Sequence, residues 1–178
     1  MGIAGGEADP GMALPAGTPS SRGDQAASAA ADTSQYVEFG IAERRYAFPI
    51  ALIREIVEPG GVTPLPHVQA CVDGIRNLRG AIIPIIDLRT LMGLPRKSID
   101  VDSRTIVLQV GDRRMGCVVD NVSQVVRIAD GDVGPAPDTI TASAPYVIGF
   151  AKYHDRLLIL LDVEELFHSR SLVRPPTS

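Results

Sequence analysis

Short apolar runs separated by turn residues fill the middle of the chain. Residues 36–41 alternate apolar and polar side chains, as a half-buried strand does. Residues 104–110, 115–119, 147–153 and 157–161 form further apolar runs, and each has the length of a strand. Many short strands with turn signals and few short helices predict an all-β fold of the sandwich or small-barrel kind.

The stretch from Gly74 to Leu94 predicts a hairpin that leads into a short helix. Gly80 can adopt a positive φ at little cost, so we expect the turn to include it. Pro84 cannot donate a ladder hydrogen bond, and its strand is therefore expected at a sheet edge or at a bulge. Asp87 precedes the helical segment, where a carboxylate can cap free N–H groups.

Two segments of the chain recur in the same order. The glycine, the apolar strand and the aspartate of residues 74–94 return 75 positions later, between Gly149 and Asp162. Residues 43–57 resemble residues 112–126 at an offset of 69. Two repeats in the same order with similar offsets predict two similar β-rich halves. With only two copies, a duplicated domain is expected rather than a solenoid.

Composition divides the chain into three parts. Residues 1–34 are rich in Ala, Gly, Pro and Ser, cannot bury enough apolar surface to offset their ordering entropy, and are expected to be a disordered tail. They lack the basic start and the continuous apolar run of a signal peptide. We expect residues 35–168 to form the folded domain and residues 169–178 to fray.

Charge and hydropathy exclude several classes of partner. The net charge of −4 and the pI near 5.3 argue against a nucleic-acid-binding protein, which needs a basic surface. There is no basic run beside an amphipathic helix, so an anionic membrane surface is not expected as a partner. No apolar stretch approaches the roughly 20 residues of a membrane-spanning helix, and direct membrane insertion is not expected.

No motif for catalysis or metal binding emerges from the sequence. GxSxG, Walker and HExxH patterns are absent, and the three histidines lie far apart. Cys71 and Cys117 have no CxxC spacing, and Cys117 is expected to be a buried thiol rather than a disulfide or a metal ligand. We therefore predict no catalytic residue, cofactor or metal. The rival hypothesis, a small enzyme or ligand-binding barrel, requires an enclosed polar pocket with convergent titratable groups.

Four motifs between residues 53 and 122 are similar to those of one family. They are Ile53-Arg54-Glu55-Ile56, the glycine-bounded segment GIRNLRG at residues 74–80, the segment IPIIDLR at residues 83–89, and VVDNV at residues 118–122. The resemblance is to the CheW family of chemotaxis coupling proteins and covers about residues 35–168. The NLRG-x-IIPIIDLR block is its most specific part.

The resemblance implies a fold of two small SH3-like β-barrel subdomains packed together. It also implies a non-enzymatic adaptor that couples chemoreceptors to the histidine kinase CheA in the cytoplasm, at receptor arrays on the inner face of the membrane. The expected partners are the regulatory domain of the kinase and the cytoplasmic tips of the receptors, which dock between the subdomains. The alternative is a scaffold of a non-flagellar chemosensory pathway, such as twitching motility.

Receptor binding is assigned by the resemblance to Glu55, Arg79, Val122 and Val125. Glu55 and Arg79 resemble a charged pair beside the receptor groove and are expected to approach each other at the surface. The alternative is that Arg79 is a solvated turn residue. Val122 and Val125 could line the groove, with packing in the strand core as the alternative.

Kinase binding is assigned by the resemblance to Ile50, Ile53 and Gly74. For the two isoleucines, ordinary core packing is the alternative.

Overall fold

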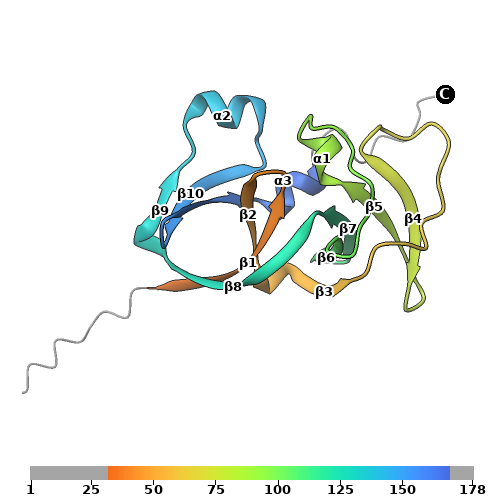
Figure 1. The fold of residues 1–178 in the computed structure, drawn as a ribbon, viewed down its shortest axis with the longest axis horizontal. Helices are drawn as coiled ribbons and strands as arrows, with labels where there is room; N and C mark the ends of the chain where they lie inside the picture. The colour runs from red at the N-terminus through yellow and green to blue at the C-terminus, as the bar shows by residue number, and fades with distance from the viewer. Residues whose placement is uncertain (1–31, 169–178) are drawn as a thin grey trace, which may run out of the picture. The chain divides into compact units, whose positions relative to one another are not determined.

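Two β-sheets, joined by turns and short helices, make up residues 32–168, which are the residues that this computed structural model describes (Figure 1). The first strand begins at Thr33, so Thr33 and Ser34 belong to a sheet and not to the expected tail. The predictions for residues 1–31 and 169–178 lie outside the described residues. No helix in the described part is long and apolar enough to cross a membrane.

The two sheets account for most of the described chain. The six-stranded sheet has the order β8 (Asn121–Ala129), β1 (Thr33–Ile41), β2 (Arg44–Pro49), β11 (Arg156–Leu161), β10 (Val147–Tyr153) and β9 (Val133–Pro135). The five-stranded sheet has the order β3 (Ile53–Val57), β6 (Arg104–Val110), β7 (Arg113–Val119), β5 (Ala81–Asp87) and β4 (Val72–Leu78). The helices are η1 (Ile50–Leu52), α1 (Leu88–Leu91), η2 (Asp130–Asp132), α2 (Asp138–Ser143) and α3 (Val163–His168). The predicted all-β fold with a few short helices is confirmed.

Strand pairing repeats between the two sheets at the predicted offsets. β5 runs parallel to β7 with Ile85 opposite Gly116, and β11 runs parallel to β2 with Leu160 opposite Ala47. Ile85 and Leu160 are 75 positions apart, and Ala47 and Gly116 are 69 positions apart. The two halves therefore share one register as well as one order of elements.

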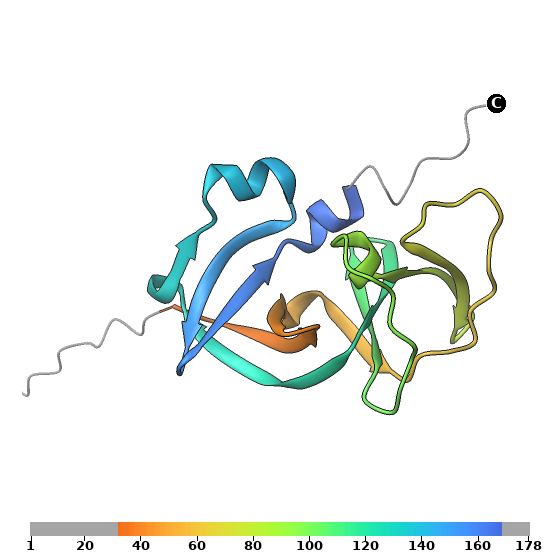
Figure 2. The same cartoon turned by 45° about the horizontal axis from the view of Figure 1, so that its top comes forward.

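An irregularity in the β4–β5 hairpin also recurs. The β4–β5 register shifts between Val72 and Gly74, and the β10–β11 register shifts between Val147 and Gly149 (Figure 2 shows β10 beside β11). Each residue of the second shift lies 75 positions after its counterpart in the first. Bulges are specific features of a fold, so the shared position supports duplication of one ancestral unit.

Each half of the chain gives one strand to the sheet of the other half. β3 follows β2 in the chain but pairs with β6, and β8 follows β7 but pairs with β1. The sheets consequently do not coincide with the two halves of the sequence. Glu55, on β3, thus belongs to the five-stranded sheet.

Both faces of the central strands are buried. Ile85 lies in a cluster inside the five-stranded barrel, and the next residue, Ile86, lies in the core shared by the two barrels. Leu160 and Leu161 divide in the same way between the interior of the six-stranded barrel and the shared core. Successive side chains of a strand point to opposite faces, which explains why these runs are apolar at every position.

Pro84 does not lie where the sequence predicted. β5 is an internal strand of its sheet, and the register shift of the β4–β5 hairpin lies at Val72–Gly74 rather than at Pro84. Opposite Pro84, Ile75 directs both of its backbone groups to Thr63, with N···O distances of 2.8 and 3.0 Å. Pairing with β7 begins only at Ile85. The missing N–H of Pro84 therefore falls just before a ladder starts, where no donor is needed.

Candidate functional site

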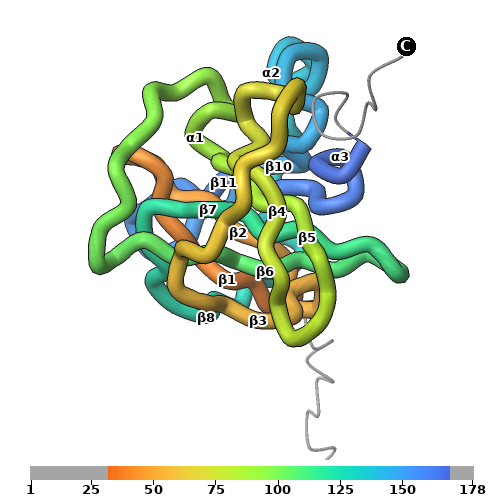
Figure 3. The backbone as a smooth tube through the Cα atoms, turned by 90° about the vertical axis from the view of Figure 1, so that its right-hand side faces the viewer, coloured from red at the N-terminus to blue at the C-terminus, as the bar shows by residue number. Residues whose placement is uncertain are grey.

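Glu55 and Arg79 form an ion pair at the surface of the five-stranded barrel. The Arg79 Nε atom lies 3.2 Å from Glu55 Oε2, and the two side chains are 81% and 22% exposed. Glu55 is on β3 and Arg79 is in the β4–β5 turn, so the pair connects the two ends of the sheet order (Figure 3 shows the hairpin tip beside β3). The predicted approach of these two residues is confirmed.

The turn that carries Arg79 is a two-residue hairpin loop. Arg79 and Gly80 have φ values of +51° and +85°, the pattern of a type I′ turn, and Asn77 Oδ1 accepts a hydrogen bond of 3.0 Å from Gly80 N. Asn and Gly favour the first position of such a turn, while a long side chain there is uncommon. The turn itself therefore does not explain why Arg79 is an arginine.

Ile50 and Ile53 lie at the crossover from β2 to β3. Ile50 begins η1 and is half-buried, while Ile53 begins β3, is half-buried and packs against the shared core. Ile53 also lines an open cavity of about 260 Å³ with Arg54 and Gln109. Both isoleucines are therefore partly accessible to a partner. Packing against the shared core accounts for only part of the Ile53 side chain.

Gly74 occupies a place that only glycine fits. Its φ is +146°, and a Cβ atom there would lie 2.1 Å from the Thr63 carbonyl oxygen. The related Gly149 shows the same constraint, since its Cβ would lie 2.5 Å from the Gly134 carbonyl oxygen. The structure thus gives Gly74 a clear packing role.

Val122 and Val125 lie on β8, in the six-stranded sheet. Val122 is half-buried and packs against the shared core, whereas Val125 is 52% exposed. Burial in the strand core is therefore wrong for Val125. The structure brings Glu55 and Arg79 together, and it places the two valines on a different sheet from that pair.

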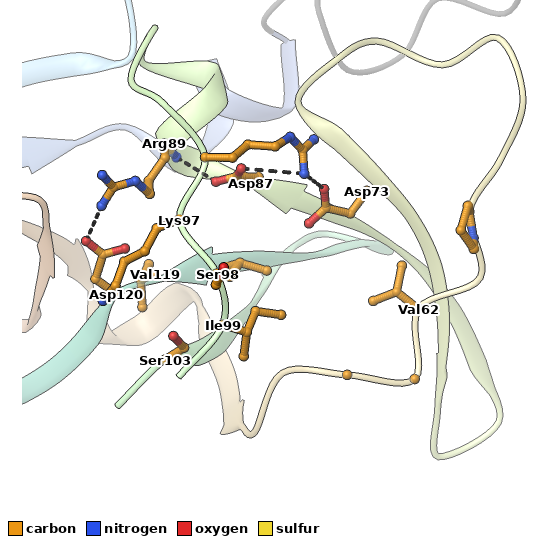
Figure 4. A pocket seen from close by; sticks show the side chains of 15 residues that line it. Val62, Asp73, Asp87, Arg89, Lys97, Ser98, Ile99, Ser103, Val119 and Asp120 are labelled. Carbon is orange, nitrogen blue, oxygen red and sulfur yellow. Dashed lines mark hydrogen bonds and ion pairs between the residues drawn. The ribbon is translucent and has the colours of Figure 1, made fainter. Parts of the chain in front are cut away.

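A polar cavity of about 470 Å³ lies beside α1 (Figure 4). Arg96 Nη1 lies 2.6 Å from Asp73 Oδ1 and 3.7 Å from Asp87 Oδ2. Lys97 pairs with Asp100 at 2.6 Å, and this hydrogen bond, with one from Ser103, lowers the pKa of Asp100 to about 2. Each of these charged side chains in the cavity lining is therefore paired with an opposite charge. Among residues 32–168, no group of three or more His, Cys, Asp or Glu side chains could hold a metal ion.

Asp87 caps α1, as the sequence predicted. Its Oδ1 accepts a hydrogen bond of 2.9 Å from Arg89 N, and its Oδ2 accepts one of 2.8 Å from the Thr90 hydroxyl. Asp162, its counterpart in the second half, accepts hydrogen bonds from Glu164 N and Glu165 N at the start of α3. Both aspartates thus satisfy free N–H groups of a first helical turn.

Asp120 and Arg89 form a clamp between the barrels that was not predicted from the sequence. Asp120 Oδ2 lies 2.5 Å from Arg89 Nη1 and also accepts a hydrogen bond of 2.8 Å from Ala42 N. Asp120 N donates to Gly40 O at 3.1 Å. The clamp connects α1 to the β1–β2 and β7–β8 turns. Both residues lie in the family motifs, but nothing in their spacing shows that they meet.

The burial of the Glu38 carboxylate was also not predicted from the sequence. The alternation of residues 36–41 predicted a half-buried strand, yet Glu38 is 0% exposed. It accepts hydrogen bonds of 3.0 Å from Arg156 Nη1 and from Gln124 Nε2, and Arg45 Nε lies 3.8 Å away. β1 lies inside its sheet, and its polar side faces the barrel rather than water.

The two cysteines are free and buried. Burial raises the pKa of the Cys117 thiol, and it is also the main cause of the raised pKa of Cys71. The expectation of a buried thiol at Cys117 is confirmed.

Comparison with known proteins agrees with this architecture. The family model for a CheW-like domain matches residues 35–171. The chain is 36% identical to the chemotaxis protein CheW of Helicobacter pylori over 132 residues, which cover 74% of this chain and 80% of that protein. It is 34% identical to the chemotaxis protein CheW of Klebsiella aerogenes over 139 residues, which cover 78% and 84%.

A solved structure is also similar. The scaffolding protein TtCheW from Thermoanaerobacter tengcongensis matches with a TM-score of 0.72 and 32% identity, over 78% of this chain and 94% of that one. This neighbour agrees with the predicted fold of two SH3-like subdomains. The chain belongs to the CheW-like domain family and, as its sequence predicted, is a chemotaxis adaptor that couples chemoreceptors to the histidine kinase CheA.

Proposed function

We propose that receptor coupling by this adaptor depends on the exposed Glu55–Arg79 pair. The observation that carries the proposal is the pair itself, in which a guanidinium 81% exposed lies 3.2 Å from a carboxylate. An exposed pair of this kind contributes only about 0–1 kcal/mol to folding, so stability alone does not account for it.

The surroundings of the pair suit a protein interface. Two large apolar side chains near the pair in the sequence are exposed: Ile56, which follows Glu55, by 40%, and Ile82, three residues after Arg79, by 61%. Arginine together with exposed apolar side chains is typical of interface centres, where a few residues carry most of the binding energy. We assign Glu55 and Arg79 to the contact with the cytoplasmic tip of the receptor.

Val122 and Val125 belong to the same proposal as apolar contacts on the other barrel. The exposure of Val125 supports a contact outside the core. For the kinase we propose the crossover residues Ile50 and Ile53 together with Gly74, in contact with its regulatory domain. For Gly74 the proposed contribution is the close backbone approach at Thr63, which shapes this part of the surface.

We further propose that the adaptor has no catalytic activity and works in the cytoplasm, at receptor arrays on the inner face of the membrane. The paired charges of the polar cavity support the first point, because a catalytic site needs titratable groups free to act on a substrate. Family membership supports the second. The alternative, that the chain is a scaffold of a non-flagellar chemosensory pathway such as twitching motility, stays a prediction.

Three variants test the receptor contact. Arg79→Glu should weaken binding of a purified receptor cytoplasmic tip by about tenfold or more, because like charges at an interface are costly. Arg79→Asn removes the charge but suits the positive φ of the turn, so binding should fall while the melting temperature stays the same or rises. The double variant Glu55→Arg/Arg79→Glu restores an ion pair with its charges exchanged. It should fold normally but bind poorly, because the receptor meets reversed charges.

Binding is measured by isothermal titration calorimetry, and folding by thermal melting. Lys152→Glu is the control, since this exposed lysine on β10 lies on the other sheet and its reversal makes the same change in charge. If Arg79→Glu melts early, Arg79 is a structural residue. Restored binding in the exchanged pair would show that the ion pair matters only within the chain, and unchanged binding in Arg79→Glu would remove the proposed site.

A further inference from the structure

The body of the β4–β5 hairpin is fixed against the segment that follows β3. Thr63 and Ile75 exchange two backbone hydrogen bonds, with N···O distances of 2.8 and 3.0 Å. On the same strand, Arg76 Nη1 donates a hydrogen bond of 2.8 Å to Glu58 O. These contacts place β4 beside the chain that leaves β3, but the tip of the hairpin comes only after them in the chain.

Arg79 lies at the tip, in a backbone conformation that does not favour arginine. Leu78 and Ala81 form the last pair of the ladder, so Arg79 and Gly80 alone make the turn. The φ of +51° at Arg79 brings its Cβ close to the following carbonyl group, which costs free energy for any residue other than glycine. A change of turn type would redirect the Cα–Cβ bond of Arg79, and with it the guanidinium that pairs with Glu55. The ion pair therefore depends on this turn.

The side chain of Asn77 holds the turn. Its Oδ1 accepts a hydrogen bond of 3.0 Å from Gly80 N. Since Arg79 lies between these two residues in the chain, the bond closes a ring that includes both peptide groups of Arg79. An asparagine side chain imitates a backbone turn in this way. The hydrogen bond thus restrains the backbone of Arg79 rather than its side chain.

The second barrel closes the corresponding hairpin without such an acceptor. The β10–β11 loop consists of His154 and Asp155, of which His154 alone has a positive φ, of +50°. Lys152, 75 positions after Asn77, takes its place there, and an ammonium group cannot accept a hydrogen bond from N–H. A hairpin with a two-residue loop therefore forms without an acceptor at this position, but its loop has a different conformation.

The second barrel also replaces both residues of the ion pair. His154 is the counterpart of Arg79, and Gln124, 69 positions after Glu55, is the counterpart of the carboxylate. Gln124 donates a hydrogen bond of 3.0 Å to the buried Glu38 instead. The asparagine acceptor and the ion pair thus occur together in the first hairpin, and both are replaced in the second.

We propose that Asn77 is a positioning residue for receptor coupling, because its hydrogen bond to Gly80 N keeps Arg79 in the turn that directs the guanidinium toward Glu55. The inference rests on the receptor contact of Glu55 and Arg79 proposed above. Without the hydrogen bond, Arg79 is free to leave its positive φ, and a smaller share of molecules presents the pair. The apparent affinity for the receptor falls with that share.

The first test removes the hydrogen bond in the full chain. Asn77→Ala should weaken binding of a purified receptor cytoplasmic tip by about three- to tenfold in isothermal titration calorimetry, as expected for one lost hydrogen bond. The Gly80 amide, followed by NMR, should exchange its hydrogen with solvent at least about threefold faster. Asn77→Asp keeps an acceptor at the same place, so it should bind more tightly than Asn77→Ala and keep the slower exchange. Unchanged exchange or unchanged binding in Asn77→Ala would overturn the proposal.

A double variant separates positioning from a general structural role. In the Arg79→Asn chain, Asn77→Ala should change receptor affinity by less than about twofold, because no guanidinium remains to be positioned. Equal losses with and without Arg79, or early melting of Asn77→Ala, would mean a structural role or a direct contact, and the proposal would fail. Lys152→Ala is the matched control, since it changes the corresponding position of the β10–β11 hairpin. Its affinity should stay within about twofold of that of the unmodified chain.

The receptor contact and the role of Asn77 fail in different ways. Normal binding by Arg79→Asn would remove the receptor contact and, with it, the role of Asn77. Weak binding by Arg79→Asn together with normal binding by Asn77→Ala would leave the contact in place and overturn only the positioning role.

Discussion

Among single residues, Glu38 is a carboxylate side chain that is completely buried. Two arginines and Gln124 surround its carboxylate, and the guanidinium groups are partly exposed, by 37% and 44%. Val107, its counterpart 69 positions later, is an ordinary apolar residue inside the other barrel. Equivalent positions inside the two barrels are therefore occupied by a carboxylate in one barrel and by an apolar side chain in the other.

We predict that Glu38→Ala destabilises the fold by about 2 kcal/mol, because it removes the hydrogen bonds from Arg156 and Gln124 and leaves a cavity. Glu38→Gln keeps the shape and part of the hydrogen bonding and should cost less, about 1 kcal/mol. Urea denaturation measures both values. Equal midpoints for Glu38→Ala and the unmodified chain would show that the buried carboxylate contributes nothing to stability.

Gly74 gives a second prediction at this scale. Gly74→Ala should destabilise by about 3 kcal/mol or more, because the added Cβ meets the Thr63 carbonyl oxygen at 2.1 Å and the φ of +146° is strained for alanine. Gly80→Ala meets no atom within 4 Å and should show only the smaller cost of its positive φ, about 1 kcal/mol. Thermal melts of both variants check this order. If the two substitutions cost the same, close approach of the backbone is not what requires glycine at residue 74.

Caps and turns could be predicted from the sequence, but burial of single polar residues could not. Asp87 and Asp162 were recognised because a capping carboxylate acts on the backbone a few residues away. Glu38 was not, since its partners Gln124 and Arg156 lie 86 and 118 positions away. Alternation of polar and apolar side chains shows which residues share a face, but does not show whether that face meets water or the inside of a barrel.

At the scale of elements, the offsets of 69 and 75 predicted the repeated register. They could not predict that β3 joins the sheet of the second half and β8 the sheet of the first half. An offset relates two similar strands but does not show which strands pair with them. The error at Pro84 has a similar origin. Whether a strand lies at an edge depends on β7, which comes later in the chain and pairs with β5 only from Ile85.

The Asp120–Arg89 clamp is the contact between elements that we expect to matter most. It is present at only one of the two crossovers, because the position 69 residues before Asp120 is Ala51. A double-mutant cycle with Asp120→Ala and Arg89→Ala should give a coupling energy of about 1–3 kcal/mol, as expected for a mostly buried charged pair.

Lys97→Ala and Asp100→Ala provide the comparison cycle, since that pair is exposed and should give a clearly smaller coupling energy. Chemical denaturation measures both cycles. A coupling energy near zero for Asp120 and Arg89 would mean that the clamp does not hold the two barrels together.

At the scale of the whole molecule, the exchanged strands and the shared core make the barrels interdependent. The shared core takes Phe39 and Phe48 from one sheet and Ile106 and Leu108 from the other. We therefore predict a single cooperative unfolding transition, with equal calorimetric and van't Hoff enthalpies. Differential scanning calorimetry tests this, and two separate transitions would show that each barrel folds by itself.

This chain couples chemoreceptors to CheA, and we propose that the coupling surface includes Glu55 and Arg79. The most direct measurement is the autophosphorylation rate of CheA, reconstituted with receptor and either the unmodified chain or Arg79→Glu. We predict that the unmodified chain brings the kinase under receptor control and that Arg79→Glu fails to do so, although its melting curve is unchanged. Full receptor control with a correctly folded Arg79→Glu would show that Arg79 is not part of the coupling surface.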